Sequence, residues 1–172
     1  MGTFIVVSGL PGSGKTTLAR AVASDLELPL LSKDTVKEAL FDTLGVGDVE
    51  WSKRLGRASV AVLLASAREL RHCVLESFWD PRLADDELRD LDGQLIELHC
   101  SCSPETARER FQERHRRDRH PGHLDDQRVD DFDTWIATGR GEPLRLGGPL
   151  LEVSTESELN TDDVVAWIRK QA

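Results

Sequence analysis

The chain has 172 residues, with 22 Lys and Arg against 31 Asp and Glu and a formal net charge of −9. This acidic balance argues against broad binding to nucleic acid or to an anionic membrane surface, and no apolar run is long enough to predict a transmembrane helix. The length and the 39% share of apolar residues predict a single domain over 1–172 with one hydrophobic core.

The first predicted elements surround a glycine-rich motif. Residues 4–8 read FIVVS, an apolar and β-branched run that predicts a buried strand, and a helical pattern begins at residue 17. Between them, GLPGSGKT at 9–16 fits the phosphate-binding pattern G-x-x-x-x-G-K-[ST]. Backbone N–H groups of such a loop cradle nucleotide phosphates. An ordinary glycine-rich turn is the weaker interpretation, because the flanking strand and helix are both in place.

The motif also predicts which residues hold the nucleotide. Lys15, which we expect to face solvent, reaches the β- and γ-phosphates as a point charge. The Thr16 hydroxyl is placed to bind Mg²⁺. Glycines allow the backbone to turn tightly and to approach an anion closely. The predicted nucleotide-binding residues of this loop are Gly9, Pro11, Gly12, Ser13, Gly14, Lys15, Thr16 and Thr17.

Strands and helices alternate along the rest of the chain. Further strands are predicted at 28–32, 72–77, 94–100 and 150–154. Further helices are predicted at 35–44, 51–70, 85–91, 103–115, 125–137 and 161–170. Asp48 is placed to cap the second of these helices. The alternation predicts an α/β protein in which helices cover both faces of a five-stranded parallel sheet. Together with the GLPGSGKT motif, this arrangement resembles the three-layer P-loop NTPase fold.

Asp34 follows the second predicted strand, at the sheet edge where ligands of parallel sheets bind. A carboxylate opposite the γ-phosphate can take a proton from an acceptor hydroxyl. The competing interpretation is that Asp34 caps the helix that follows it. The sequence leaves both roles open.

An acidic and aromatic segment follows the third predicted strand. Glu76 could hold Mg²⁺ through water or contact the substrate, and the alternative is a solvated carboxylate at a strand end. Phe78 and Trp79 come directly after it and are placed to line an acceptor pocket. Trp51 is as well explained by core packing.

A basic cluster follows the fourth predicted strand, where a lid would close over the phosphates at about 113–124. Arginine donors there would neutralise charge on the transferred phosphoryl group, and the alternative is a helix face paired with nearby acids. His115, His120 and His123 lie in the same region and are better explained as structural or substrate-facing than as a metal site. The cluster consists of Arg108, Arg110, Arg114, Arg116, Arg117 and Arg119.

These motifs resemble those of the small P-loop kinases. This group includes chloramphenicol phosphotransferase, gluconate and shikimate kinases and the kinase domain of polynucleotide kinases. The carriers of the resemblance are residues 9–16, SKDTVKE at 32–38, the segment 76–79 and the basic region 110–123. The resemblance implies that Asp34 binds or deprotonates the acceptor hydroxyl and that Lys37 lies beside it. It further implies a lid of Arg110, Arg114, Arg117 and Arg119, with Arg117 catalytic, and an adenine border at Ser154 and Thr155.

The sequence therefore predicts a cytoplasmic, Mg²⁺-dependent kinase that transfers the γ-phosphate of ATP to a hydroxyl of a small molecule. An antibiotic, a sugar or a nucleoside-like acceptor fits, and the oligomeric state stays open. The cysteines, Cys73, Cys100 and Cys102, suit the cytoplasm. One alternative is a 5′-hydroxyl polynucleotide kinase. Another is a nucleotide-hydrolysing switch, although the Asn-Lys-x-Asp motif of a GTPase is absent. The predicted acceptor-side residues are Asp34, Lys37, Glu76, Phe78 and Trp79.

Overall fold

The structure is a computed structural model that describes residues 2–117 and 119–171. Its strands are β1 (Gly2–Ser8), β2 (Leu30–Ser32), β3 (His72–Glu76), β4 (Gly93–Ser101) and β5 (Leu150–Ser154). Its α-helices are α1 (Lys15–Asp25), α2 (Lys33–Leu44), α3 (Val49–Leu70), α4 (Pro81–Arg89), α5 (Pro104–Arg117), α6 (Asp131–Ala137) and α7 (Thr161–Ile168). Two 3₁₀ turns, η1 (Pro121–His123) and η2 (Asp125–Arg128), lie between α5 and α6.

The five strands form one sheet in the order β2-β3-β1-β4-β5, and every neighbouring pair is parallel. Parallel pairing brings the carboxyl ends of the strands to one edge. The register pairs Ser32 with Glu76 and Val7 with Glu76, so the ends of β1, β2 and β3 meet beside the glycine-rich loop. The predicted α/β fold class and the five-stranded parallel sheet are confirmed.

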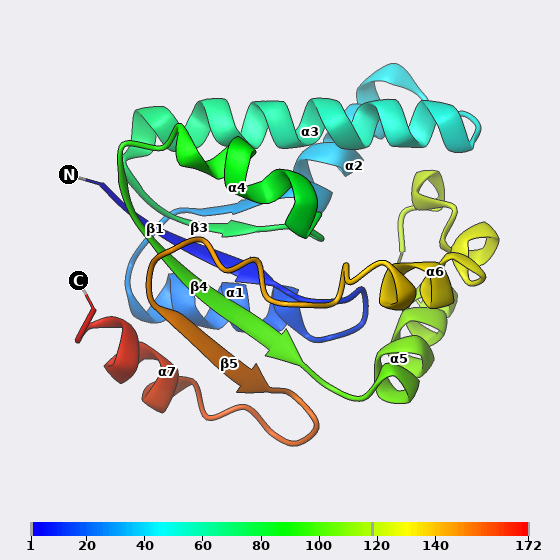
Figure 1. The fold of residues 1–172 in the computed structure, drawn as a ribbon. Helices are drawn as coiled ribbons and strands as arrows, with labels where there is room; N and C mark the ends of the chain where they lie inside the picture. Colours follow the sequence, from blue (N-terminus) through cyan, green and yellow to red (C-terminus); the bar gives the residue numbers. More distant parts are fainter. Residues whose placement is uncertain (1, 118, 172) are drawn as a thin grey trace.

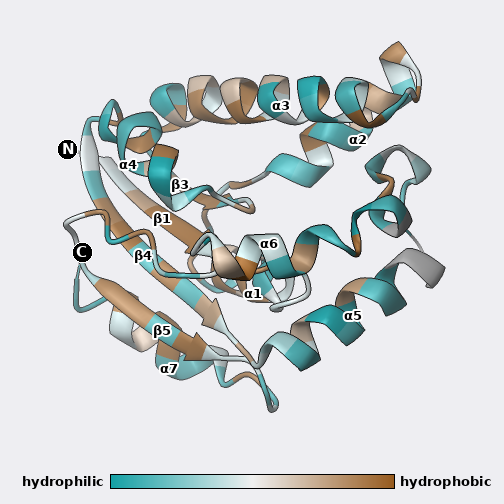
Figure 2. Cartoon of the chain, turned by 45° about the vertical axis from the view of Figure 1, so that its right-hand side comes forward, coloured by the Kyte–Doolittle hydropathy of each residue, from teal (hydrophilic) through white to brown (hydrophobic). Residues whose placement is uncertain are grey.

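Helices cover both faces of the sheet, as Figure 1 shows. On one face, α1 and α7 pack on a cluster that includes Ile5, Val74 and Ile96. On the other face, α3 and α4 pack on a cluster that includes Phe4 and Leu75. Successive strand residues point to opposite faces, which is why neighbours in β1 serve different clusters. The hydropathy colouring of Figure 2 shows apolar strands enclosed by helices with polar outer faces.

A third cluster joins the glycine-rich loop to the C-terminal half. Leu10, Phe111, Phe132 and Trp135 pack together, with α5 and α6 as their scaffold. The ring centroids of Phe111 and Trp135 are 6.0 Å apart in an edge-on arrangement, a favoured aromatic geometry. This cluster fixes the loop against α6 and against α5, which carries part of the basic region.

Several element boundaries differ from the predictions. α2 begins at Lys33 and not at residue 35, with Ser32 at its N-cap position, and β2 begins at Leu30, two residues later than predicted. α4 begins at Pro81, where Pro suits a first helical turn and the Asp80 carboxylate accepts a hydrogen bond from the Arg82 N–H.

The predicted helix at 125–137 is divided into η2 and α6, and the first turn of α6 carries acidic residues that favour a helix N-terminus. α5 continues to Arg117, two residues beyond the predicted end, because arginine is a good helix former. Within 2–117 and 119–171, none of the helices combines the length and the apolar character that a bilayer crossing demands.

Candidate active site

The glycine-rich loop turns directly into the N-terminus of α1. Gly12 and Gly14 have left-handed backbone angles, with φ of 84° and 85°. A Cβ on Gly12 would lie 2.1 Å from the carbonyl oxygen of Ala107 in α5, so only glycine fits there. Gly14 is the N-cap residue and supplies no side-chain acceptor to the first turn of α1. The loop therefore has the strand, turn and helix geometry of an anion site.

Lys15 is 7% exposed, so the expectation that it faces solvent is wrong. Its Nζ donates a hydrogen bond to the Leu10 carbonyl at 2.7 Å and lies 5.9 Å from the centre of the Phe78 ring. Lys15 lines a cleft together with Phe78, Phe111 and Trp135. Burial lowers the pKa of Lys15, and the nearby Glu76 carboxylate opposes this shift.

Glu76 is 4% exposed at the end of β3, so the solvated strand-end interpretation is wrong. Its carboxylate accepts hydrogen bonds from the Ser32 hydroxyl at 2.6 Å and from the Thr16 hydroxyl at 3.3 Å. The register of β1, β2 and β3 brings these groups together. A hydroxyl and a carboxylate in contact are hard oxygen donors of the kind that Mg²⁺ prefers.

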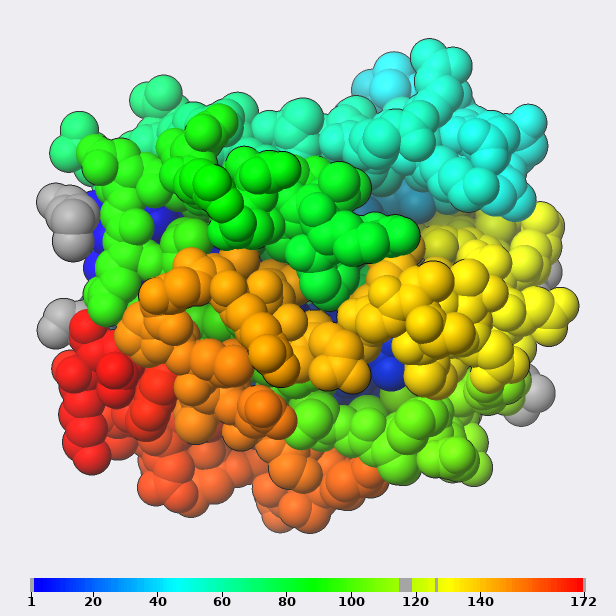
Figure 3. Space-filling view, viewed as in Figure 1, coloured from blue at the N-terminus to red at the C-terminus, as the bar shows by residue number. Residues whose placement is uncertain are grey.

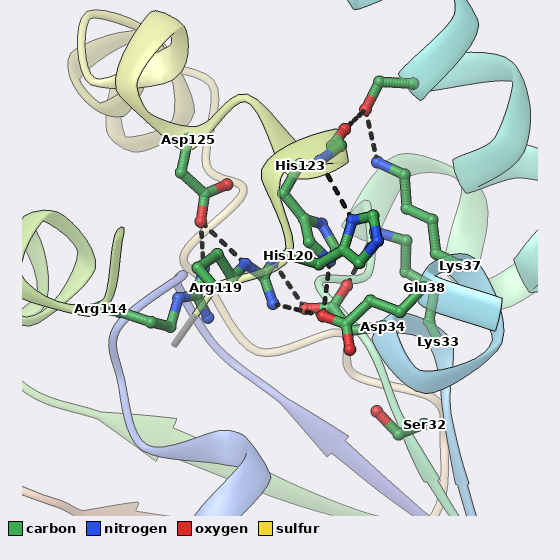
Figure 4. A network of polar contacts seen from close by, with 12 residues as sticks. Ser32, Lys33, Asp34, Lys37, Glu38, Arg114, Arg119, His120, His123 and Asp125 are labelled. Carbon is green, nitrogen blue, oxygen red and sulfur yellow. Dashed lines mark hydrogen bonds and ion pairs between the residues drawn. The ribbon is translucent and has the colours of Figure 1, made fainter. Parts of the chain in front are cut away.

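Asp34 lies in the first turn of α2 and not at its N-cap, so the capping interpretation is wrong. Its carboxylate lies 3.4 Å from the Lys33 ammonium and 2.9 Å from the Arg119 guanidinium, as Figure 4 shows. Burial opposes ionisation, but Lys33 and Arg119 outweigh it and hold the pKa of Asp34 well below its ordinary value. Asp34 lines the same cleft as Lys15 and Thr16, so an ionised carboxylate lies beside residues of the glycine-rich loop.

Arg119 joins the segment after α5 to α2. Besides Asp34, it contacts Glu38 at 3.5 Å and the buried Asp125 at 3.0 Å. Arg114 of α5 reaches the same Asp125 carboxylate at 3.1 Å. Two of the four predicted lid arginines, Arg114 and Arg119, therefore meet at one buried acid, next to the predicted acceptor-side carboxylate.

The predicted adenine border lies at the opposite end of the loop. Arg110 donates to the Thr155 carbonyl at 2.9 Å, and the Thr155 hydroxyl donates to the Ser13 carbonyl at 2.8 Å. Ser154 is exposed beside it. Arg108 instead pairs with Asp133 of α6 and stacks on the Phe132 ring. The predicted catalytic Arg117 lies outside the residues whose side chains are described, as do His115 and Arg116.

The remaining predicted residues lie on the acceptor side. Lys37 is buried and donates to the Ser52 hydroxyl at 2.8 Å, which ties α2 to α3. Phe78 makes an edge-on contact with Trp135 at a centroid distance of 5.0 Å. Trp79 is 3% exposed in the core, where its indole N–H donates to the Val7 carbonyl at 3.2 Å.

The predicted histidine region takes part in polar contacts with α2. His120 Nε2 lies 3.2 Å from Asp42, and His123 Nε2 lies 2.8 Å from Glu38. In the described part of the chain, no group of His, Cys, Asp and Glu side chains has the arrangement of a metal site. These histidines anchor η1 on α2.

Four basic residues near the cleft were not singled out from the sequence. Lys53, Arg57, Arg128 and Arg140 line a cavity of about 510 Å³ that adjoins the cleft lined by Lys15, Thr16 and Asp34. Arg140 stacks on Phe78 with its guanidinium carbon 4.4 Å from the ring centre. In the sequence Arg140 stands between glycines, in a segment where no helix or strand is predicted, so no periodic pattern marks it. Figure 3 shows the blue atoms of the N-terminal segment between the gold residues of α6 and the green residues of α5.

A buried acid holds that irregular segment over the sheet. Glu97 of β4 accepts hydrogen bonds from the backbone N–H groups of Leu144 and Arg145 at 2.7 and 2.9 Å. It also accepts one from the Ser8 hydroxyl at 2.8 Å, and Ser8 in turn contacts His99. This satisfied polar network keeps the chain that carries Arg140 next to the cleft.

Comparisons with known proteins extend over most of the chain. The family model described as an AAA domain matches residues 4–138. A solved structure of a candidate kinase from Chloroflexus aurantiacus is 35% identical, with a TM-score of 0.90, and covers 99% of this chain and 98% of that one. Shikimate kinase from Acinetobacter baumannii, solved with shikimate, is 16% identical with a TM-score of 0.56, and the match covers 99% of this chain and 92% of that one.

A further sequence match, to cytidylate kinases, covers only part of the chain. Cytidylate kinase from Pyrobaculum islandicum is 47% identical over 49 residues, which is 28% of this chain. The matched stretch spans only 27% of that relative. The structural likenesses confirm the resemblance to the fold of small P-loop kinases.

Proposed function

The chain belongs to the AAA-domain family, and on that premise we propose that it is a kinase that transfers the γ-phosphate of ATP to a hydroxyl of a small molecule. The observation that carries the proposal is the ionised Asp34 carboxylate in the cleft lined by Lys15 and Thr16. A phosphate acceptor there would meet a like charge, whereas a hydroxyl can donate a hydrogen bond to the carboxylate. This supports an alcohol as the acceptor.

The phosphate end of the reaction depends on the glycine-rich loop. The loop and the first turn of α1 would hold the phosphates, and Lys15 would leave the Leu10 carbonyl to neutralise charge on the transferred group. Thr16 and Glu76 supply oxygen donors that fit Mg²⁺. The metal, when bound, neutralises the developing charge on the phosphate oxygens. Arg110, Ser154 and Thr155 would border the adenine.

The acceptor end depends on Asp34. The hydroxyl oxygen forms the new bond to the γ-phosphorus, the bond to the bridging oxygen of ADP breaks, and the hydroxyl proton passes late to the carboxylate. Lys33 and Arg119 contact different oxygens of Asp34, and each oxygen keeps a lone pair for the incoming hydroxyl. Because its pKa is low, Asp34 acts mainly by orienting the hydroxyl.

A screen tests the proposal directly. Purified protein, Mg²⁺ and ATP are incubated with a panel of alcohols, sugars and nucleosides, and ADP release is followed for each compound. We expect at least one hydroxyl compound to stimulate ADP release. Cytidine 5′-monophosphate serves as the phosphate-acceptor control, and its conversion to the diphosphate at a rate above that of every alcohol would reject the proposal.

A further inference from the structure

The cavity beside the phosphate cleft is the place where an acceptor would bind. Its volume is about 510 Å³, enough for a small organic molecule. Its walls come from α2, α3 and α4, from the segment between β3 and α4, from η1 and η2, and from Arg140. Lys33, Lys37 and Phe78 line both the cavity and the cleft that holds Asp34. A molecule in the cavity can therefore reach Asp34 directly.

The cavity is basic although the chain has a net charge of −9. Six Lys and Arg side chains and only two carboxylates, Asp80 and Glu87, take part in its lining. Asp80 is already bound by Arg82, whose nitrogens lie 2.9 and 2.7 Å from the two carboxylate oxygens. A concave site with walls of low dielectric constant focuses the electric field of such an excess of positive charge, and it therefore attracts anions.

Four of the six basic side chains already have an acidic partner. These pairs are Lys33 with Asp34 at 3.4 Å, Lys53 with Glu50 at 2.8 Å, Arg128 with Asp131 at 3.1 Å and Arg140 with Asp80 at 3.6 Å. Lys37 and Arg57 have no carboxylate within ion-pair distance in the parts of the chain that the structure describes. Lys37 is only 3% exposed, and its hydrogen bond to Ser52 and its contact with the Phe41 ring leave its charge without a carboxylate partner. A bound anion would balance such a buried cation.

Lys37 and Arg57 approach the same turn of α3. A Cβ built on Gly56 would lie 3.9 Å from the Lys37 ammonium, so this ammonium lies against the turn that also carries Arg57. The lining next to them is apolar, with Val60 and Leu64 on the following turns of α3. The wall therefore offers two cations beside an apolar surface.

We propose that the acceptor is a hydroxy compound with an apolar body and an oxyanion group, a carboxylate or a phosphate monoester, which binds Lys37 and Arg57 while the hydroxyl reaches Asp34. This inference rests on the proposed function, because it assigns the acceptor class of the same site. The two ends of the site then have opposite preferences. The cationic end binds the anion, and the ionised Asp34 repels it and accepts the hydroxyl.

Matched compounds test the inference. The panel contains alicyclic and aromatic hydroxycarboxylic acids, the corresponding hydroxyalkyl phosphates, and the neutral amides of the same acids. ADP release gives kcat and KM for each compound. Thermal stabilisation of the protein with Mg²⁺ and a non-hydrolysable ATP analogue gives binding independently of turnover. We expect the oxyanion compounds to exceed their amides by about tenfold or more in kcat/KM, since hydrogen bonds to charged groups contribute about 1.5–3 kcal/mol.

The variant Arg57→Gln removes one cation from an exposed position of α3. It should raise KM for the oxyanion compounds about tenfold and leave KM for the amides and for ATP within about twofold. Arg20→Gln is the control, because Arg20 is an exposed arginine of α1 outside the cavity lining. Preference for carboxylates over phosphates, or the reverse, identifies the oxyanion.

Three results distinguish a failure of this inference from a failure of the proposed kinase function. Amides that equal their acids, or an Arg57→Gln variant with unchanged KM for the acids, would overturn the inference and leave the proposed function standing. Failure of every oxyanion compound to stabilise the nucleotide complex would also overturn it. Stabilisation that Arg57→Gln abolishes, without any phosphorylated product, would support the anion site and reject the kinase proposal.

Discussion

The substitution Asp34→Asn separates the charge of the acceptor-side carboxylate from its shape. The asparagine side chain keeps an oxygen that can accept a hydrogen bond from the substrate hydroxyl, but it cannot take the hydroxyl proton. General-base loss costs about 10²–10⁴-fold. Because Lys33 and Arg119 hold the pKa of Asp34 well below its ordinary value, the carboxylate is a weak base, and we expect the lower end, about 10²-fold in kcat. This equals about 2.7 kcal/mol of transition-state stabilisation.

Steady-state kinetics with a phosphorylatable acceptor measures this loss. KM for ATP should stay within about twofold, because Asp34 contacts Lys33 and Arg119 and not the glycine-rich loop. Glu38→Gln is the matched control, since Glu38 also contacts Arg119, at 3.5 Å, but does not line the cleft. Near-native transfer by Asp34→Asn, or an equal loss in Glu38→Gln, would refute the assignment of the acceptor-side role to Asp34.

Other positions give independent predictions. Lys15→Met should lower ATP-dependent turnover by about 10²–10³-fold while circular dichroism stays native, because the apolar stem fits the buried site. Gly12→Ala should lower the free energy of unfolding by about 2 kcal/mol or more in urea titrations, while Gly147→Ala, with φ of 77° and open space around it, should cost about 1 kcal/mol. Residues 113–124 should gain hydrogen-exchange protection with nucleotide and acceptor bound, and unchanged protection would count against a lid. Burial lowers the pKa of Lys37 to about 8, so between pH 8 and 10.5 the unfolded chain binds more protons than the native protein. In that window, the stability of the wild type relative to Lys37→Met should rise with pH, by on the order of 3 kcal/mol.

The sequence was sufficient for the fold because local signals agreed with one another. The apolar run of β1, the glycine motif and the helical pattern of α1 each predict the next element. The same agreement placed Glu76 at a strand end and Asp34 beside the cleft. These features are determined by residues that are close to one another in the sequence, so they can be recognised from the sequence alone.

Features that depend on distant contacts could not be read in this way. Lys15 is buried in a cleft that Phe111 of α5 and Trp135 of α6 also line, and the pairing of Arg119 with Asp34 joins positions 85 residues apart in the sequence. Arg140 reaches the cavity because Glu97 holds an irregular segment across the sheet. No periodicity encodes such contacts, because they arise from packing between elements.

The fate of the γ-phosphate tests the central claim most directly. ATP labelled with ¹⁸O at the γ-phosphate is incubated with the protein, Mg²⁺ and an acceptor that stimulates ADP release, and the products are analysed by mass spectrometry and ³¹P NMR. The account predicts a phosphate monoester of the acceptor that carries the label, in an amount equal to the ADP formed. Labelled inorganic phosphate with an unmodified acceptor would contradict it and would identify a nucleotide hydrolase.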